Sequence, residues 1–307
     1  MATLFTPLPL GPLMLRNRIA RAPLPIRAAA PGGFVTEELV GSYRRWAAGG
    51  AGLVLSEPIS VAPSRQPGLA TLHSDMLVPE IARLVRAIES HGAHLLPLLS
   101  HPPLPPHQLA ARDLEPIREA FVAAAWRARA AGCRGVAIHG AEHTLLHQLH
   151  SPLSNRRRDA YGLDRILLAQ EIVEGIRRWL GPGLVIGYRL VADEFSDEGI
   201  GLHESRVAAR RLVAAGVDLL DVVPGLQPGQ PIARFPGWQI PLAAAIKAVT
   251  DVPVIVNGGM GEPAFASSVI EEGSADLVGL GAILNEDPQW PRHAARALAA
   301  GSPASPL

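Results

Sequence analysis

The chain has 307 residues, of which 48% are hydrophobic and only 5% aromatic, so it is long enough to bury one large core. Its composition is uniform along the chain, so we expect a single domain over residues 1–307. Lysine and arginine together number 28, as do aspartate and glutamate, so no net charge draws the protein to nucleic acid or to a membrane surface. The expected partner is a small-molecule substrate, and a homo-oligomer is left open.

Nothing in the sequence indicates secretion or membrane insertion. The single cysteine, Cys133, cannot form an intrachain disulfide and precedes a predicted strand, so we expect a buried small hydrophobe. The N-terminus lacks the basic start, apolar run and small-residue cleavage site of a signal peptide. No stretch of about 18 uncharged apolar residues occurs. We therefore expect a protein of the cytoplasm.

Short apolar runs alternate along the chain with longer amphipathic segments, as in βα units around a parallel sheet. The eight predicted strands are nearly continuous in apolar residues, as suits strands buried on both faces: Arg18–Ala22, Gly52–Leu55, His94–Leu99, Gly135–Ile138, Leu184–Leu190, Leu219–Val223, Val254–Val256 and Leu277–Leu280. The clearest helices between them are Pro79–Ser90, Pro116–Ala131, Arg165–Trp179, Glu204–Ala215 and Pro263–Glu272. The alternation predicts a (β/α)8 TIM barrel.

In such a barrel the reactive groups lie at the carboxyl ends of the strands. His101 and His139 follow adjacent predicted strands, Glu142 comes soon after His139, and Arg189 ends another strand. A carboxylate beside a histidine raises the imidazole pKa and orients the ring for acid/base chemistry. A pocket wall without chemistry explains the same residues equally well. The Pro/Gly-rich segment from Gln227 to Trp238 is long enough to act as a lid.

One histidine pattern in this region also occurs in metal sites. His139, Glu142 and His143 form H-x-x-E-H, a pattern found in a class of zinc peptidases. The metal pattern needs both histidines on one helical face, whereas here His139 closes a strand, so no metal is predicted. His147 and His150 continue from His143 at helical spacing, which a solvated or core-lining helix face also explains.

Three separated segments of the chain carry a family resemblance. The segments are Leu4-Phe5 with Leu10-Gly11, Asn17-Arg18-Ile19 and Ala22-Pro23, then "GVAIHGAEHTLLHQLHSPLSNRRRDAYG" from Gly135 to Gly162, then "VNGG" at Val256 to Gly259 followed by "DLVGLGAILNEDP" from Asp276 to Pro288. Their order and spacing resemble those of the Old Yellow Enzyme family of flavin oxidoreductases. The resemblance implies a (β/α)8 barrel with FMN over its mouth and hydride transfer from NAD(P)H to an activated alkene.

The resemblance assigns roles to several residues. Arg189 matches the arginine beside the flavin pyrimidine ring, where a guanidinium stabilises negative charge on the reduced flavin. His139 matches the first member of the pair that holds the substrate's carbonyl oxygen. Backbone amides at Gly258, Gly259 and Gly281 can bind a phosphate.

Other family positions carry residues of different chemistry. The replaced groups are the second oxygen-binding residue (now Glu142), the proton-donating tyrosine (Thr144), the hydroxyl or thiol that tunes the flavin (Pro25), a backbone N–H donor (Pro58), the glutamine at the pyrimidine edge (Leu98) and the phosphate-clamping arginine (Ala282). Most side chains expected around a flavin are therefore missing.

From this selective loss we predict an enzyme that needs no cofactor and uses acid/base chemistry, such as isomerisation, cyclisation or elimination, on a small conjugated carbonyl compound. The predicted catalytic residues are His139, Glu142, His101 and Arg189. The predicted pocket wall consists of Pro25, Glu57, Leu98, His143, Thr144 and Tyr161. Two alternatives stay open: an atypical FMN-dependent NAD(P)H oxidoreductase, either ene-reductase or dehydrogenase, and a non-catalytic pseudoenzyme.

Overall fold

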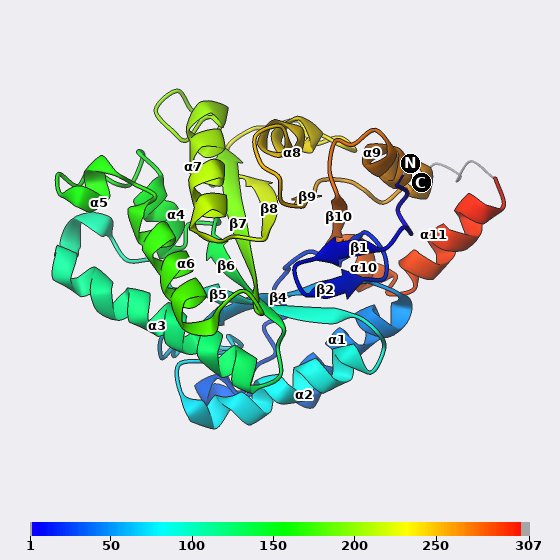
Figure 1. The fold of residues 1–307 in the computed structure, drawn as a ribbon, viewed down its shortest axis with the longest axis horizontal. Helices are drawn as coiled ribbons and strands as arrows, with labels where there is room; N and C mark the ends of the chain where they lie inside the picture. The colour runs from blue at the N-terminus through cyan, green and yellow to red at the C-terminus, as the bar shows by residue number, and fades with distance from the viewer. Residues whose placement is uncertain (1, 302–307) are drawn as a thin grey trace.

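The structure, a computed structural model, describes residues 2–301. Eight parallel strands close into a barrel in the order β10, β3, β4, β5, β6, β7, β8, β9, which confirms the predicted (β/α)8 barrel (Figure 1). The barrel strands are β3 (Ile19–Arg21), β4 (Leu53–Ser60), β5 (His94–Ser100), β6 (Gly135–Gly140), β7 (Val185–Asp193), β8 (Leu219–Pro224), β9 (Val254–Val256) and β10 (Leu277–Leu280).

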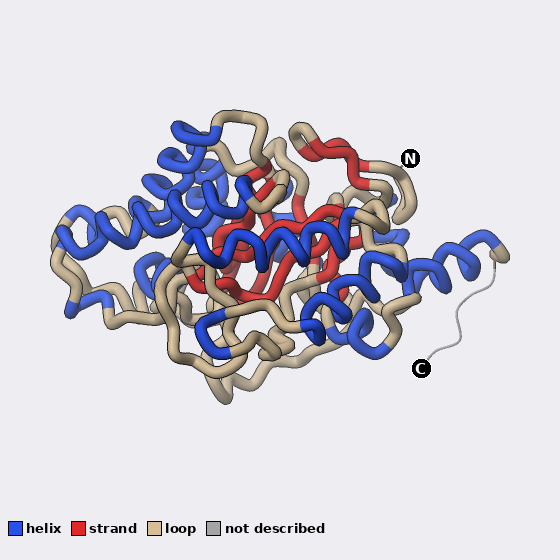
Figure 2. The backbone as a smooth tube through the Cα atoms, turned by 90° about the horizontal axis from the view of Figure 1, so that it is seen from below, coloured by secondary structure: helices blue, strands red, loops and turns tan. Residues whose placement is uncertain are grey.

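Helices surround the strands, as Figure 2 shows in a view from below relative to Figure 1. They are α1 (Glu37–Gly49), α2 (Val78–Glu89), α3 (Ala111–Ala130), α4 (Leu145–His150), α5 (Ala160–Leu163), α6 (Leu167–Leu180), α7 (Leu202–Ala215), α8 (Ile240–Lys247), α9 (Pro263–Glu271), α10 (Ala282–Glu286) and α11 (Trp290–Ala299). The five predicted helices are confirmed as α2, α3, α6, α7 and α9. Helix α3 begins before the expected Pro116, because the Asp113 carboxylate accepts the Ala110 N–H at 2.7 Å and caps the helix upstream.

All eight predicted strands are present, and the largest difference in length is at β4. This strand continues past Pro58 to Ser60, and its pairing with β5 shifts register between Leu55 and Pro58. A bulge lets the chain pass a residue that lacks an N–H without ending the strand. The proline therefore marks an irregularity inside the strand and not its end.

A hairpin absent from the sequence prediction closes the amino end of the barrel. Strands β1 (Leu8–Leu10) and β2 (Leu13–Leu15) pair in an antiparallel manner. Their four leucines form one buried cluster with inward-facing barrel residues that include Leu53, Leu96 and Leu98. Because the hairpin packs apolar side chains against this end, the polar residues of the barrel interior gather at the opposite, carboxyl end.

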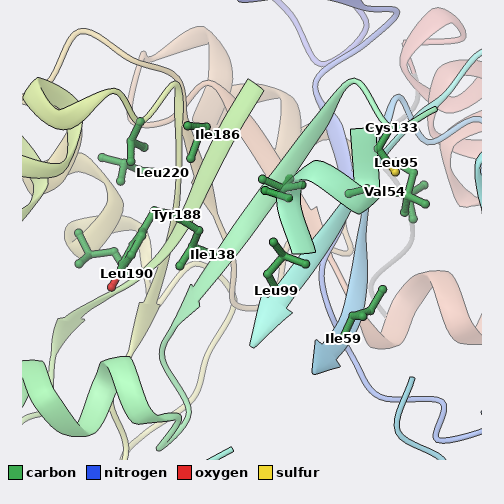
Figure 3. Close-up of a cluster of buried hydrophobic side chains, with 14 of the residues drawn as sticks. Val54, Ile59, Leu95, Leu99, Cys133, Ile138, Ile186, Tyr188, Leu190 and Leu220 are labelled. Carbon is green, nitrogen blue, oxygen red and sulfur yellow. The ribbon is translucent and has the colours of Figure 1, made fainter. Parts of the chain in front are cut away.

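Outward-facing residues of the strands pack against the helices. Figure 3 shows part of this layer, in which Val54 and Leu95, register partners on β4 and β5, lie beside Cys133. The thiol is buried and free, as expected, and burial raises its pKa. None of the helices within residues 2–301 combines the length and apolarity that a bilayer crossing requires.

Candidate active site

Four adjacent strands place polar side chains in one layer at the carboxyl end of the barrel. His139 on β6 is in register with Arg189 on β7, and Arg189 is in register with Asp221 on β8. Asn257 directly follows β9. Alternate residues of a strand point to the same side, and the residues two positions before His139 and Asp221 belong to the barrel's inner cluster. The polar layer therefore faces inward, directly above the apolar interior.

Arg189 is the centre of a charged network in this layer. Its guanidinium forms an ion pair with Asp221 through Nη1 and a second with Glu142, where Nη2 lies 2.8 Å from Oε1. Asn257 Nδ2 donates to Asp221 Oδ1 at 2.7 Å. Arg189 and Asp221 are buried, whereas the Glu142 side chain is 48% exposed. One cation is thus shared between two carboxylates.

The ionisation of these groups follows from their contacts. Burial on its own would lower the pKa of Arg189, but the charges of Asp221 and Glu142 outweigh burial and raise it. Burial on its own would raise the pKa of Glu142, but the neighbouring His139 and Arg189 outweigh burial and hold that pKa well below its usual range. Both side chains are therefore charged at neutral pH.

His139 has a different electrostatic character. Its side chain is buried, and burial is the main reason that its pKa lies below the usual value, so the imidazole is neutral at pH 7. Nδ1 and Nε2 are both buried without a hydrogen-bond partner among residues 2–301. Glu142 Oε2 lies 3.5 Å from Nε2, beyond ordinary hydrogen-bond distance. Polar atoms of this kind are uncommon in native proteins and indicate a place for a ligand.

The loop that carries Glu142 is held in an unusual backbone conformation. Glu142 and His143 are consecutive non-glycine residues with left-handed backbones, at φ 56° and 60°. Such residues cost about 1–3 kcal/mol each and collect at functional sites. The loop is fixed at both sides: the Thr144 hydroxyl donates to the His139 carbonyl at 2.9 Å, and the His143 N–H donates to Nδ1 of His147 at 3.0 Å.

His147 is in turn fixed by a buried carboxylate. Its Nε2 lies 3.1 Å from Glu194 Oε1, while Glu194 Oε2 accepts the Ser151 hydroxyl and the Ile200 N–H, each at 2.7 Å. Because Nδ1 accepts a hydrogen bond, the neutral ring carries its proton on Nε2 and donates to Glu194. The Glu194–His147 pair therefore acts as a support beneath the strained loop.

A cavity of about 250 Å³ opens in front of His139 and Glu142. Eight of the residues that line it, most of them predicted site residues, are Pro25, Glu57, Pro58, His101, His139, Glu142, His143 and Thr144. The expected approach of His139 and Glu142 is confirmed. His101 joins them in the lining, with its Nδ1 2.9 Å from the Pro102 carbonyl and its pKa lowered by burial.

Two residues expected in the pocket wall lie elsewhere. Leu98 is fully buried in the inner cluster of the barrel, because its position on β5 alternates with outward-facing neighbours. Tyr161 lies on α5, and its hydroxyl donates to Glu171 of α6 at 3.1 Å. Neither lines the cavity in front of His139. The prediction for these two residues is therefore corrected.

The glycines expected to bind a phosphate lie together beyond β9 and β10, which pair in register. Gly258 and Gly259 have left-handed backbones, at φ 92° and 78°. A Cβ on Gly259 would lie 2.8 Å from Pro236 Cα, and one on Gly281 would lie 2.8 Å from Leu24 Cδ1. The Gly237 N–H also donates to the Gly258 carbonyl at 2.9 Å. The segment predicted as a lid thus lies directly over this end of the mouth.

His150, at the end of α4, makes the stability of this region sensitive to pH. Burial lowers the pKa of His150 from 6.5 to about 4. The unfolded chain therefore takes up this proton before the folded chain does, and stability falls as the pH drops below 6.5. We expect His150 to account for a loss of about 2 kcal/mol between pH 7 and pH 5.

Urea unfolding of the wild-type protein and of His150→Leu, measured across this range, tests the expectation. The variant should lose less stability than the wild type as the pH falls, because leucine carries no titrating group. Equal pH dependence in the two proteins would show that His150 is not the source of the effect.

The closed barrel and the cluster of titratable groups at its carboxyl end define a (β/α)8-barrel enzyme. Comparison with known families is more specific: residues 3–104 and 99–300 match the NADH:flavin oxidoreductase / NADH oxidase family. The chain belongs to this family.

Individual relatives agree with this assignment. An NADH oxidase of Thermoanaerobacter brockii is 33% identical, over 93% of this chain and 49% of the relative. An NADPH dehydrogenase of a Geobacillus species is 30% identical, over 96% of this chain and 94% of the relative. The structure of an old yellow enzyme homologue from Zymomonas mobilis has a TM-score of 0.79 at 21% identity, over 99% of this chain and 94% of that chain. The chain spans about half the length of the NADH oxidase.

Family membership corrects the predicted chemistry and the predicted absence of a cofactor. The family is one of NADH:flavin oxidoreductases, so the predicted isomerase, cyclase or lyase chemistry without a cofactor is wrong. The alternative of an FMN-dependent oxidoreductase is the better supported one. The physical reason is one of weight: the prediction gave the lost side chains more weight than the backbone amides of Gly258, Gly259 and Gly281, which do not depend on side-chain identity.

Two parts of the barrel mouth fit the FMN that this family implies. At one, Nε of Arg189 and both ring nitrogens of His139 are buried without a partner among residues 2–301, which suits the polar edge of a planar ring. At the other, the glycines beyond β9 and β10 present backbone without side chains, which suits a phosphate. Leu24 and the segment from Gln227 to Trp238 cover the glycines, so we expect this cover to shift when a phosphate binds.

Proposed function

We propose that the protein is an FMN-dependent NAD(P)H oxidoreductase, an ene-reductase or dehydrogenase that acts on a small molecule in the cytoplasm. The observation that carries the proposal is the buried pair of Arg189 and His139, with unpartnered nitrogens, at the mouth of a barrel of this family. The balanced charge and the single buried thiol suit a soluble enzyme of a reducing compartment.

When bound, FMN would supply the hydride transfer between the nicotinamide and the substrate. Arg189 would hold the pyrimidine edge and stabilise negative charge there, and Asp221 and Asn257 would keep its guanidinium in place. Gly258, Gly259 and Gly281 would bind the phosphate through backbone amides. His139, Glu142 and His101 would hold the substrate in the cavity and position its protons.

Ala282 offers a direct test of the flavin site. It is exposed at the first position of α10, next to Gly281, so an arginine there meets no packed neighbour and restores the cation that the family places at the phosphate. A charge-assisted hydrogen bond contributes about 1.5–3 kcal/mol, so we expect Ala282→Arg to bind FMN about 10–100 times more tightly than the wild type. Titration of FMN, followed by absorbance or calorimetry, measures this change.

Riboflavin, which lacks the phosphate, is the matched control ligand. Its affinity should be the same in the wild type and in Ala282→Arg, because the new guanidinium has no partner on it. Failure of both proteins to bind FMN would refute the proposed function. Equal gains for riboflavin and FMN would show that the arginine does not act on the phosphate.

A further inference from the structure

Glu142, one of the residues that differ from their family counterparts, projects a carboxylate into the cavity. One oxygen, Oε1, is taken by Arg189 at 2.8 Å, whereas Oε2 points toward His139 at 3.5 Å without a hydrogen bond. About half of the side chain is exposed, and it lines the cavity together with His139. One carboxylate oxygen is therefore available to a ligand.

The charges around this oxygen do not cancel. Arg189 carries one positive charge, but it is shared between Glu142 and Asp221, so the three residues together carry one net negative charge. Burial keeps His139 neutral, so the ring adds no positive charge. Its near nitrogen, Nε2, faces the Glu142 carboxylate, so the free oxygen Oε2 is the acceptor that this end of the cavity presents to a ligand.

The other charged residues of the cavity do not cancel the negative charge at Glu142. Glu57 lies in the lining, and its Oε2 is held by the backbone N–H groups of Ile26 and Arg27, at 2.6 and 3.0 Å. Arg27 also lines the cavity, but its side chain is exposed to solvent, where its charge is screened. The Glu142 carboxylate is therefore the charged group that a ligand at the inner end of the cavity meets.

A ligand that satisfies this acceptor and the excess negative charge must donate a hydrogen bond and carry positive charge. An enolate or a carboxylate would be repelled by Glu142, and a neutral carbonyl oxygen has no proton to give to Oε2. A protonated amine has both properties. The unpartnered nitrogens of buried His139 indicate independently that a polar group belongs here.

We propose that the cavity selects substrates that carry a protonated amine, which Glu142 binds through Oε2. This inference rests on the proposed function and narrows its substrate class. It makes Glu142 the residue that determines specificity for charge, in the place where the family positions a residue for a carbonyl oxygen.

Three probes of nearly the same shape test the proposal: benzylammonium, benzyl alcohol and benzoate. Calorimetric titration of the wild-type protein, with and without saturating FMN, is expected to show benzylammonium binding about tenfold or more tightly than benzyl alcohol, and benzoate binding most weakly. In Glu142→Gln, benzylammonium should lose that advantage while benzyl alcohol binds as before. In Glu142→Asp, which keeps the charge, most of the preference for benzylammonium should remain.

Glu38→Gln serves as the matched control, because it removes an exposed carboxylate on α1 that does not line the cavity. It should bind all three probes like the wild type. Equal affinities for the three probes, no measurable binding of benzylammonium, or an unchanged preference in Glu142→Gln would overturn the proposal. The FMN titration is read separately, so loss of flavin binding would refute the proposed function, whereas loss of charge preference would refute only this inference.

Discussion

Replacement of Arg189 with leucine is expected to lower the free energy of unfolding by about 3–5 kcal/mol, because it leaves a buried charge without a partner. Asp221 is buried and forms an ion pair with this guanidinium, and Glu142 forms the second. Among residues 2–301, only Asn257 would remain to hydrogen-bond Asp221 through its side chain. Urea or thermal unfolding of the purified variant measures the loss.

Two further variants separate the buried charge from the loss of packing. The double variant Arg189→Leu with Asp221→Leu should recover a substantial part of the stability, since it removes the unpaired carboxylate as well. Arg211→Leu breaks a comparable pair with Asp164, but there the side chains are 38% and 32% exposed, so we expect a loss of about 1 kcal/mol or less. Similar losses for Arg189→Leu and Arg211→Leu would contradict our account of the network.

Replacement of Glu194 with leucine is expected to cost at least about 3 kcal/mol, because three buried donors lose their acceptor. These donors are the His147 ring, the Ser151 hydroxyl and the Ile200 N–H, and Glu194 itself is completely buried. Glu194→Gln keeps the shape and one oxygen, so it should lose clearly less. Chemical unfolding of the two variants gives the comparison.

The same variant should also affect the cavity, since Glu194 and His147 support the loop of Glu142 and His143. Without Glu194, His147 is no longer fixed as the acceptor of the His143 N–H, so the left-handed backbone of Glu142 and His143 is less well stabilised. The preference for benzylammonium should therefore fall. If Glu194→Leu is as stable as the wild type and keeps that preference, the buried pair does not support the loop.

The barrel could be predicted from sequence because its strands are buried on both faces and read as separate apolar runs. The N-terminal hairpin was missed because Leu8–Leu10 and Leu13–Leu15 are too short to show a period, and only tertiary packing against the barrel interior stabilises them. The extension of β4 was missed because Pro58 reads as the end of a strand.

The site was predicted less completely than the fold. Residues that follow strands were found, since the barrel brings the carboxyl ends of all strands to one face. Asp221 was missed although the sequence indicates it, because it is a single charged residue inside the apolar run from Leu219 to Val223. His147 and Glu194 are separated by 47 positions, and nothing local shows that they pair. The cofactor prediction failed because it gave the replaced side chains more weight than the backbone donors at Gly258, Gly259 and Gly281.

The strand pairing that closes the barrel has a consequence for folding during synthesis. Strand β10 pairs with β3, and Arg18 donates to the Asp276 carbonyl across 258 positions of sequence. The ring is therefore incomplete until the last strand has left the ribosome, and β3 has an unpaired edge during synthesis. Because such distant pairing makes folding slow, we expect the nascent chain to need protection from aggregation while this edge of β3 is unpaired.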